Sequence, residues 1–123
     1  MLTRMAHFPH PHAKSRAPRL CFTAGESITF SVEGKETQGT LQVVSTTGGS
    51  ARILRPLTPG TLAEISLHLS TGPVSALVEF LPPRPQGRFF AQAFRFVAFG
   101  DDDYARFHRT LQMLRAGERM ARV

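Results

Sequence analysis

Residues 27–99 form a succession of short segments in which apolar and polar side chains alternate, and each segment ends at a turn-forming sequence. Residues 62–69 alternate most regularly, because Ala63 and every second residue after it are apolar while Glu64, Ser66 and His68 lie between them. A period of two residues places the apolar side chains on one face, which is typical of a half-buried antiparallel strand. His68 falls on the polar face, so we expect an exposed side chain.

The sequence predicts six such strands, over residues 27–33, 40–44, 51–54, 62–69, 74–81 and 88–99. In the second of them, alternation places Leu41 and Val43 on one face. Residues 82–87 hold three prolines and a glycine, which predicts the longest break between strands. Six strands at this spacing indicate an antiparallel barrel or sandwich. Because the chain has ten phenylalanines, one tyrosine and no tryptophan, we expect a core rich in phenylalanine.

The hydrophobic period changes after Phe99. Asp101 can cap the N-terminus of a helix, and the two aspartates that follow it favour the positive end of the helix dipole. One helical face then collects Tyr104, Phe107, His108, Leu111 and Leu114. The pattern predicts a helix within residues 101–123 whose apolar stripe packs on the barrel. Gly117 is a candidate helix end, although residues 118–123 can also continue the helix.

The first 18 residues contain three prolines and three lysine or arginine residues without sustained periodicity, which predicts a flexible basic arm. The chain is therefore divided into an arm (1–18), a barrel (19–100) and a helix (101–123). The arm's three histidines match no closed zinc site, so we expect no metal. The single cysteine, Cys21, excludes an intramolecular disulfide. No apolar run approaches the roughly 18 residues of a membrane span, so we expect a cytoplasmic protein without a membrane partner.

The net charge of +6 comes mostly from arginine, since only two of the 15 basic residues are lysine. Arginine forms bidentate contacts with phosphates and guanine edges, which makes a nucleotide, a nucleic acid or an acidic protein surface a candidate partner. An arginine-rich codon bias accounts for the charge equally well. The sequence has no P-loop and no GxGxxG motif, and Glu64 and Glu79 match no catalytic arrangement. We therefore expect a protein that is not an enzyme and needs no cofactor.

Residues 44–49 combine the end of an apolar strand with a double-glycine turn, and a second strand leaves that turn. This segment, the basic arm, the late aromatic strand around residues 94–97 and the terminal helix resemble the PilZ domain, the bacterial receptor fold for cyclic di-GMP. The resemblance covers residues 16–114. It implies a mainly β fold, a small antiparallel six-stranded β-barrel with a C-terminal α-helix.

PilZ domains pair an RxxxR motif with a later DxSxxG motif. By this resemblance, Arg16 and Arg19 would hold a phosphate and the guanine Hoogsteen edge. Thr46 and the backbone of Gly48 and Gly49 would line the pocket. These five residues are the predicted ligand-binding site.

Two departures from the family pattern reduce the expected affinity. The sequence from Arg16 to Arg19 is one residue shorter than RxxxR, and Val44 stands where the aspartate belongs. Valine cannot accept a hydrogen bond from guanine, and leaving such a donor unpaired costs about 1–3 kcal/mol. The resemblance thus implies a regulatory signalling module that binds cyclic di-GMP with weakened affinity.

Two alternatives remain at this point. A domain of the same fold can act as a protein-interaction adaptor that no longer binds the nucleotide, using a partner that the sequence does not identify. A small barrel with this charge can also bind nucleic acid, although only the charge favours that function.

Overall fold

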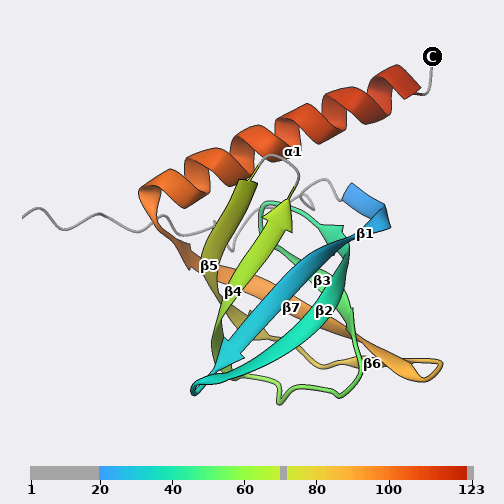
Figure 1. Ribbon diagram of the computed structural model, residues 1–123, viewed down its shortest axis with the longest axis vertical. Helices are drawn as coiled ribbons and strands as arrows, with labels where there is room; N and C mark the ends of the chain where they lie inside the picture. The colour runs from blue at the N-terminus through green and yellow to red at the C-terminus, as the bar shows by residue number, and fades with distance from the viewer. Residues whose placement is uncertain (1–19, 70–71, 122–123) are drawn as a thin grey trace, which may run out of the picture.

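The computed structural model describes residues 20–69 and 72–121 of the chain, with side chains over residues 26–69 and 72–115. Its strands form a coiled antiparallel barrel, and a single helix lies across one end of that barrel (Figure 1). The elements are β1 (Leu20–Val32), β2 (Lys35–Val44), β3 (Gly48–Ile53), β4 (Leu62–Leu69), β5 (Gly72–Phe80), β6 (Arg84–Gln86), β7 (Phe89–Phe99) and α1 (Asp101–Ala121).

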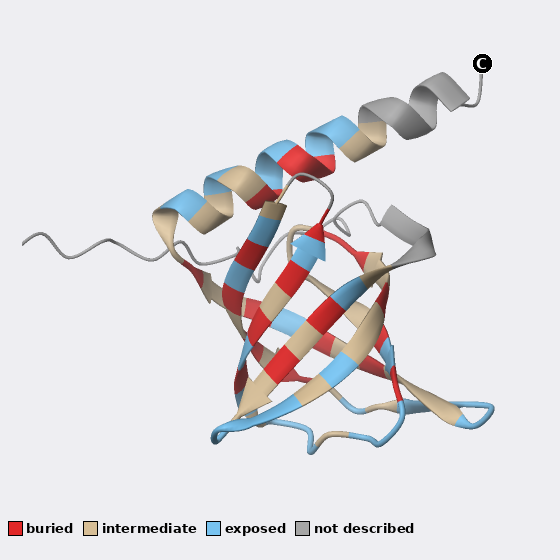
Figure 2. Cartoon of the chain, viewed as in Figure 1, coloured by how far each residue is buried: buried red, intermediate tan, exposed pale blue. Residues whose placement is uncertain are grey.

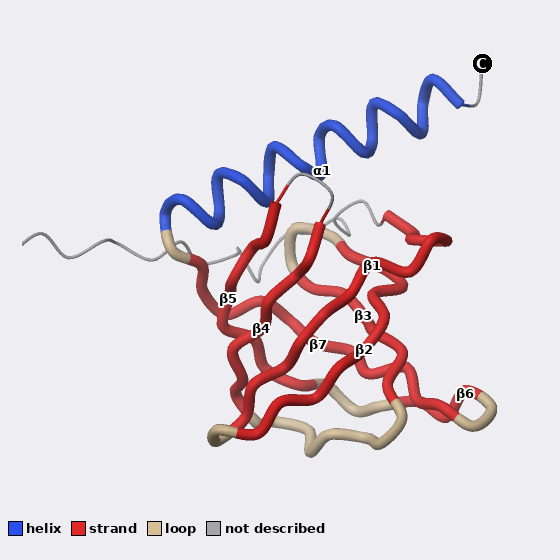
Figure 3. Tube along the Cα trace, viewed as in Figure 1, coloured by secondary structure: helices blue, strands red, loops and turns tan. Residues whose placement is uncertain are grey.

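The sheet order is β3-β2-β1-β4-β5-β7-β6, and a further pairing between β3 and β7 closes the barrel. Six antiparallel strands therefore form the closed barrel, which confirms the predicted fold. The seventh strand, β6, lies in the proline-rich break where no strand was expected. It pairs only with the start of β7 and forms a hairpin that projects from the barrel (Figure 3). Proline is tolerated in β6 because an edge strand does not need every N–H group.

Along most strands, apolar residues of the alternating pattern are buried and the polar residues between them are more exposed. In β4 the residues from Ala63 to Leu69 alternate between buried and more exposed positions, and His68 is exposed as expected. Figure 2 shows the same alternation as bands of buried residues along the strands. The β1–β2 hairpin is tight because Glu33 and Gly34 both adopt positive φ values, of 50° and 81°. Two such residues form the turn that matches the twist of paired strands.

Alternation fails in β2, where the pairing with β3 contains a bulge between Leu41 and Val43. The extra residue shifts the strand by one position, so Leu41 and Val44 are both fully buried while Val43 is only partly buried. The expectation that Leu41 and Val43 share a face is therefore wrong. A bulge reverses the facing of every residue that follows it, and periodicity alone cannot reveal that shift.

Phenylalanine fills the centre of the barrel, as its abundance predicts. Phe30 contacts Phe80 and Phe94 edge to face, with ring centroids 5.3 and 5.9 Å apart. Phe107 of α1 joins this cluster by stacking on Phe99 at 5.2 Å. Such pairs add about 0.5–1.5 kcal/mol each to the free energy gained by burying the rings.

Helix α1 begins at Asp101, the predicted start, and continues past Gly117 to Ala121, so Gly117 does not end it. Phe107 and Leu111 are buried against the barrel, which places the predicted stripe on the core side. Two polar contacts also hold the helix on β5. Asp103 Oδ1 accepts a hydrogen bond from the Ser75 amide at 3.0 Å, and Arg106 donates one to the Pro73 carbonyl at 2.8 Å.

One polar side chain lies in the core at the opposite end of β7. Gln92 is fully buried, and its oxygen accepts a hydrogen bond from the Leu57 amide at 2.9 Å. Its nitrogen donates to the carbonyl oxygens of Leu81 and Ala93 at 2.8 and 3.1 Å. Gln92 thus bonds to backbone groups of the segments around Leu57 and Leu81 and of β7 itself.

Candidate ligand-binding face

The turn between β2 and β3 is closed by Ser45, a residue that the predicted site does not include. Ser45 is 6% exposed, and its amide donates to the Gly48 carbonyl at 2.7 Å. Its hydroxyl oxygen accepts from the Thr47 amide at 3.2 Å and lies 3.3 Å from the Gly48 carbonyl. The Thr47 carbonyl in turn accepts from the Phe96 amide at 2.8 Å. Serine favours such turns because its short side chain can bond to nearby backbone.

Gly48 and Gly49 are required by the close approach of the strands on either side of β3. A Cβ atom on Gly48 would overlap the carbonyl oxygen of Phe94 in β7. A Cβ atom on Gly49 would overlap the carbonyl oxygen of Val43 in β2. Neither glycine has a positive φ, so the need is for space and not for an unusual backbone conformation. The double glycine therefore has a structural explanation that is independent of any ligand.

Val44 is the residue that stands in the aspartate position by the resemblance to the PilZ motif. It is fully buried in the core. Its neighbour Val43 is partly exposed and pairs with Ser50 of β3. If the DxSxxG motif is laid one residue earlier, Ser45 and Gly48 match its serine and glycine, and Val43 takes the place of the aspartate. Thr46, the predicted serine equivalent, is partly buried in the turn itself.

A row of small side chains covers the outer face of the barrel beside this turn. Val43, Ser50 and Ala93 are register partners across β2, β3 and β7, so their side chains point to the same side. All three are partly exposed. They form what we call the outer floor, a surface without long side chains next to the β2–β3 turn.

Two arginines flank the outer floor along the strand direction. Arg52 lies two residues beyond Ser50 on β3, and Arg95 lies two residues beyond Ala93 on β7. Because the strands are antiparallel, the two arginines lie on opposite sides of the Ser50–Ala93 pair, and Arg95 is the register partner of Gly48. Four residues of extended strand separate the two positions by about 13 Å, at roughly 3.3 Å per residue.

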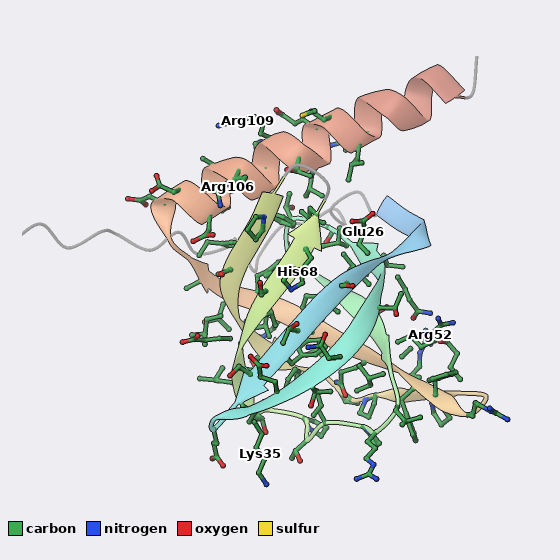
Figure 4. The ribbon with its side chains drawn as sticks, viewed as in Figure 1. Glu26, Lys35, Arg52, His68, Arg106 and Arg109 are labelled. Atoms are coloured by element: carbon green, nitrogen blue, oxygen red, sulfur yellow. The ribbon has the colours of Figure 1, made fainter. Side chains whose placement is uncertain are left out.

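The two arginines differ in their partners. The Arg52 guanidinium carbon lies 5.1 Å from the centre of the Phe89 ring, a cation–π contact that orients the exposed side chain. No carboxylate among the described residues pairs with it. Arg95 instead bonds to Glu79 of β5, with Nε and Nη2 at 2.6 and 2.5 Å from Oε1. Figure 4 shows Arg52 on the side of the barrel near the β6 hairpin, and Arg109 on α1 across the barrel end.

A side-chain hydrogen bond marks one border of this face. Gln42 of β2 donates to Gln86 of β6 at 3.1 Å. These strands are not neighbours in the sheet, so the bond ties the projecting hairpin to β2.

The structure brings three of the five predicted site residues together. Thr46, Gly48 and Gly49 lie at the β2–β3 turn or directly after it. Arg16 and Arg19 lie outside the described residues, as do the histidines of the arm. Within residues 26–69 and 72–115, no group of three or more His, Cys, Asp or Glu side chains is arranged to hold a metal ion. No helix in the described part of the chain is long and apolar enough to cross a membrane.

Sequence reasoning missed Ser45, Arg52 and Arg95. The motif shifted by one residue would have found Ser45, because Ser45 and Gly48 have the spacing of its serine and glycine. Alternation along the last strand would have placed Arg95 on the face opposite Phe94 and Phe96. No sequence signal shows that Arg52 and Arg95 lie on either side of the same floor, since this follows from the β3–β7 pairing.

Comparison with known proteins identifies the fold. No family model and no curated protein sequence matches the chain. Among solved structures, the PilZ domain of YcgR from Escherichia coli with c-di-GMP has a TM-score of 0.73 at 13% identity, covering 89% of this chain and 97% of that domain. MrkH of K. pneumonia in its apo state has a TM-score of 0.74 at 16% identity, covering 88% of this chain and 55% of that one.

A longer YcgR structure from Escherichia coli, in complex with c-di-GMP, gives a TM-score of 0.74 at 15% identity and covers 88% of this chain. The chain spans about half the length of that structure and of MrkH, 49% and 55% respectively. It spans nearly all of the isolated YcgR domain. The barrel and helix described above therefore have the fold of a PilZ domain.

Proposed function

We propose that this chain is a bacterial regulatory module, a PilZ-type receptor that binds cyclic di-GMP on the outer floor between Arg52 and Arg95. The observation that carries the proposal is the pair of arginines on either side of a floor of small residues, next to a serine-closed turn. The same fold in YcgR is described with c-di-GMP. A receptor of this kind performs no catalysis and acts in the cytoplasm.

The chemistry of the face suits an anionic ligand with flat bases. A guanidinium group can form two parallel hydrogen bonds with a phosphate or with the O6 and N7 atoms of guanine. The outer floor carries only Val43, Ser50 and Ala93, so a planar base can approach the sheet without displacing long side chains. Arg16 and Arg19 of the arm would add contacts to the ligand, and Thr46 with Gly48 and Gly49 would border it.

The missing acid lowers the expected affinity in either alignment of the motif. A valine occupies the aspartate position whether that position is Val43 or Val44. The guanine N–H donors then lose a charged acceptor, and hydrogen bonds to charged groups contribute about 1.5–3 kcal/mol. We expect binding weaker than that of a PilZ domain with the acid by about ten- to a hundredfold, since each 1.4 kcal/mol is a factor of ten.

Calorimetric titration of the full chain with cyclic di-GMP tests the proposal. Arg52→Ala should weaken binding at least about tenfold, because a bidentate charged contact is lost. Arg109→Ala is the matched control, since Arg109 is also an exposed arginine but lies on α1. Equal affinities of both variants, with the fold retained, would exclude the outer floor as the binding face.

Other ligands separate the alternatives. Binding confined to cyclic di-GMP, and absent for GMP and cyclic di-AMP, supports the receptor. Binding of any oligonucleotide that strengthens with length and weakens with salt supports a nucleic-acid-binding barrel. An absence of nucleotide binding, together with a protein that co-purifies with the chain, supports the adaptor.

A further inference from the structure

Arg95 is held on one side of its strand by an ion pair with Glu79. Its Nε and Nη2 atoms lie 2.6 and 2.5 Å from the same carboxylate oxygen, Oε1. The two residues are register partners on β5 and β7, so the pair is formed directly across neighbouring strands. The side chain of Arg95 is 52% exposed and that of Glu79 is 27% exposed.

On its other side Arg95 faces the β2–β3 turn. Its register partner there is Gly48, which has no side chain. Arg95 therefore lies between a carboxylate on β5 and a glycine of β3 that carries no side chain, at the border of the outer floor where the ligand of the proposed function would lie.

The ion pair changes what Arg95 can offer to an anion. Glu79 occupies the Nε–H and Nη2–H edge of the guanidinium and neutralises its charge. A phosphate beside Gly48 must displace this carboxylate to bond to that edge of the guanidinium. Arg52, which has no carboxylate partner among the described residues, carries no such cost.

We propose that Glu79 is an internal competitor for Arg95, and that this ion pair lowers the affinity of the face for its anionic ligand. This inference rests on the proposed function, because it concerns the same face. Arg95 contacts the ligand only after leaving Glu79, and removal of the carboxylate makes the arginine available in advance.

Glu79→Gln tests the inference by removing the charge while preserving the size of the side chain. An exposed ion pair is weak, so we expect cyclic di-GMP to bind about two- to fivefold tighter, with the melting temperature nearly unchanged. Glu64→Gln is the matched control, since it alters the net charge equally on the neighbouring strand β4, where no described residue forms an ion pair with Glu64. It should change affinity by less than about 1.5-fold, because surface charges are screened by salt.

The double variant Glu79→Gln with Arg95→Ala shows whether Glu79 changes the affinity through Arg95. If Glu79 acts through Arg95, then Arg95→Ala weakens binding and Glu79→Gln gives no gain in that background. The Arg95 Nε–H signal in NMR should also shift on ligand addition in the parent protein.

The outcomes distinguish the inference from the function on which it rests. If the parent binds and Glu79→Gln does not bind tighter, or binds tighter equally without Arg95, the competitor role is wrong and the receptor function stands. If neither the parent nor Glu79→Gln binds cyclic di-GMP at millimolar concentration, both the proposed function and this inference are overturned.

Discussion

An aspartate introduced at Val43 or at Val44 should have opposite consequences, although the two positions are adjacent. Val44 is fully buried beside the barrel core, whereas Val43 is partly exposed on the outer floor. The bulge in β2 produces this difference, since regular alternation from Leu41 would have placed Val43 inside. Introducing the acid of the PilZ motif therefore tests which of the two side chains points outward, as well as whether the acid improves binding.

The cost of Val44→Asp follows from its burial. The protein loses the transfer free energy of a buried valine side chain, about 1.5–3 kcal/mol. It must also bury a carboxyl group that has no hydrogen-bond partner, at about 1–3 kcal/mol even when protonated. The sum, about 2.5–6 kcal/mol, is a large part of the total stability of roughly 5–15 kcal/mol expected for one domain.

Val43→Asp should change stability by no more than about 1 kcal/mol, the range over which strand preferences vary at partly exposed sites. Its carboxylate would face the outer floor and could accept the N1–H and N2–H₂ donors of guanine. A hydrogen bond to a charged group contributes about 1.5–3 kcal/mol, which would lower Kd for cyclic di-GMP about ten- to a hundredfold.

Urea denaturation and calorimetric titration measure the two effects separately. Val43→Asn is the matched control, because it has the shape of aspartate without the charge and should gain much less affinity. Two results would refute the reasoning: a Val44→Asp protein that is as stable as its parent, or a folded Val43→Asp protein that binds no tighter than Val43→Asn.

Three further substitutions test the packing, each by urea denaturation against the parent. Gly48→Ala should cost about 1–3 kcal/mol, since its new methyl group would overlap the Phe94 carbonyl. Gln92→Leu should cost at least about 2 kcal/mol, because it removes the partners that Gln92 gives to the Leu57 amide and the Leu81 carbonyl, both partly buried. Leu111→Ala should cost about 2–5 kcal/mol, the range for a buried leucine. A loss below the ~0.5 kcal/mol typical of surface sites would contradict the packing at that position.

The sequence predicts the barrel well because strands that are buried on one face must alternate. Residues 62–69 were predicted with the bounds that β4 has, and the helix start at Asp101 was predicted as well. Strand β6 escaped prediction because Pro85 and the flanking prolines argue against a strand, and only its position at an edge makes it compatible with one.

The candidate site was predicted less completely because its parts come from strands that are distant in sequence. The double glycine was visible, but its physical cause, the carbonyl groups of Val43 and Phe94, appears only when β2, β3 and β7 are paired. The bulge in β2 turns Val44 into the core and Val43 outward, which alternation could not reveal. Arg52 and Arg95 come to lie on either side of one surface only because β3 pairs with β7 and closes the barrel.

The turn and the arginines carry different weight as evidence for a ligand. Ser45 closes the turn through its own hydrogen bonds, and Gly48 and Gly49 are needed for strands to pass close together, so a barrel of this shape needs all three even without a ligand. Arg52 and Arg95 contribute little to the packing, since one is exposed over a ring and the other forms a half-exposed ion pair. A barrel that had lost its ligand could keep the turn motif and lose both arginines at little cost in stability. Binding measurements on the arginine variants therefore test the function, whereas variants of the turn test mainly the fold.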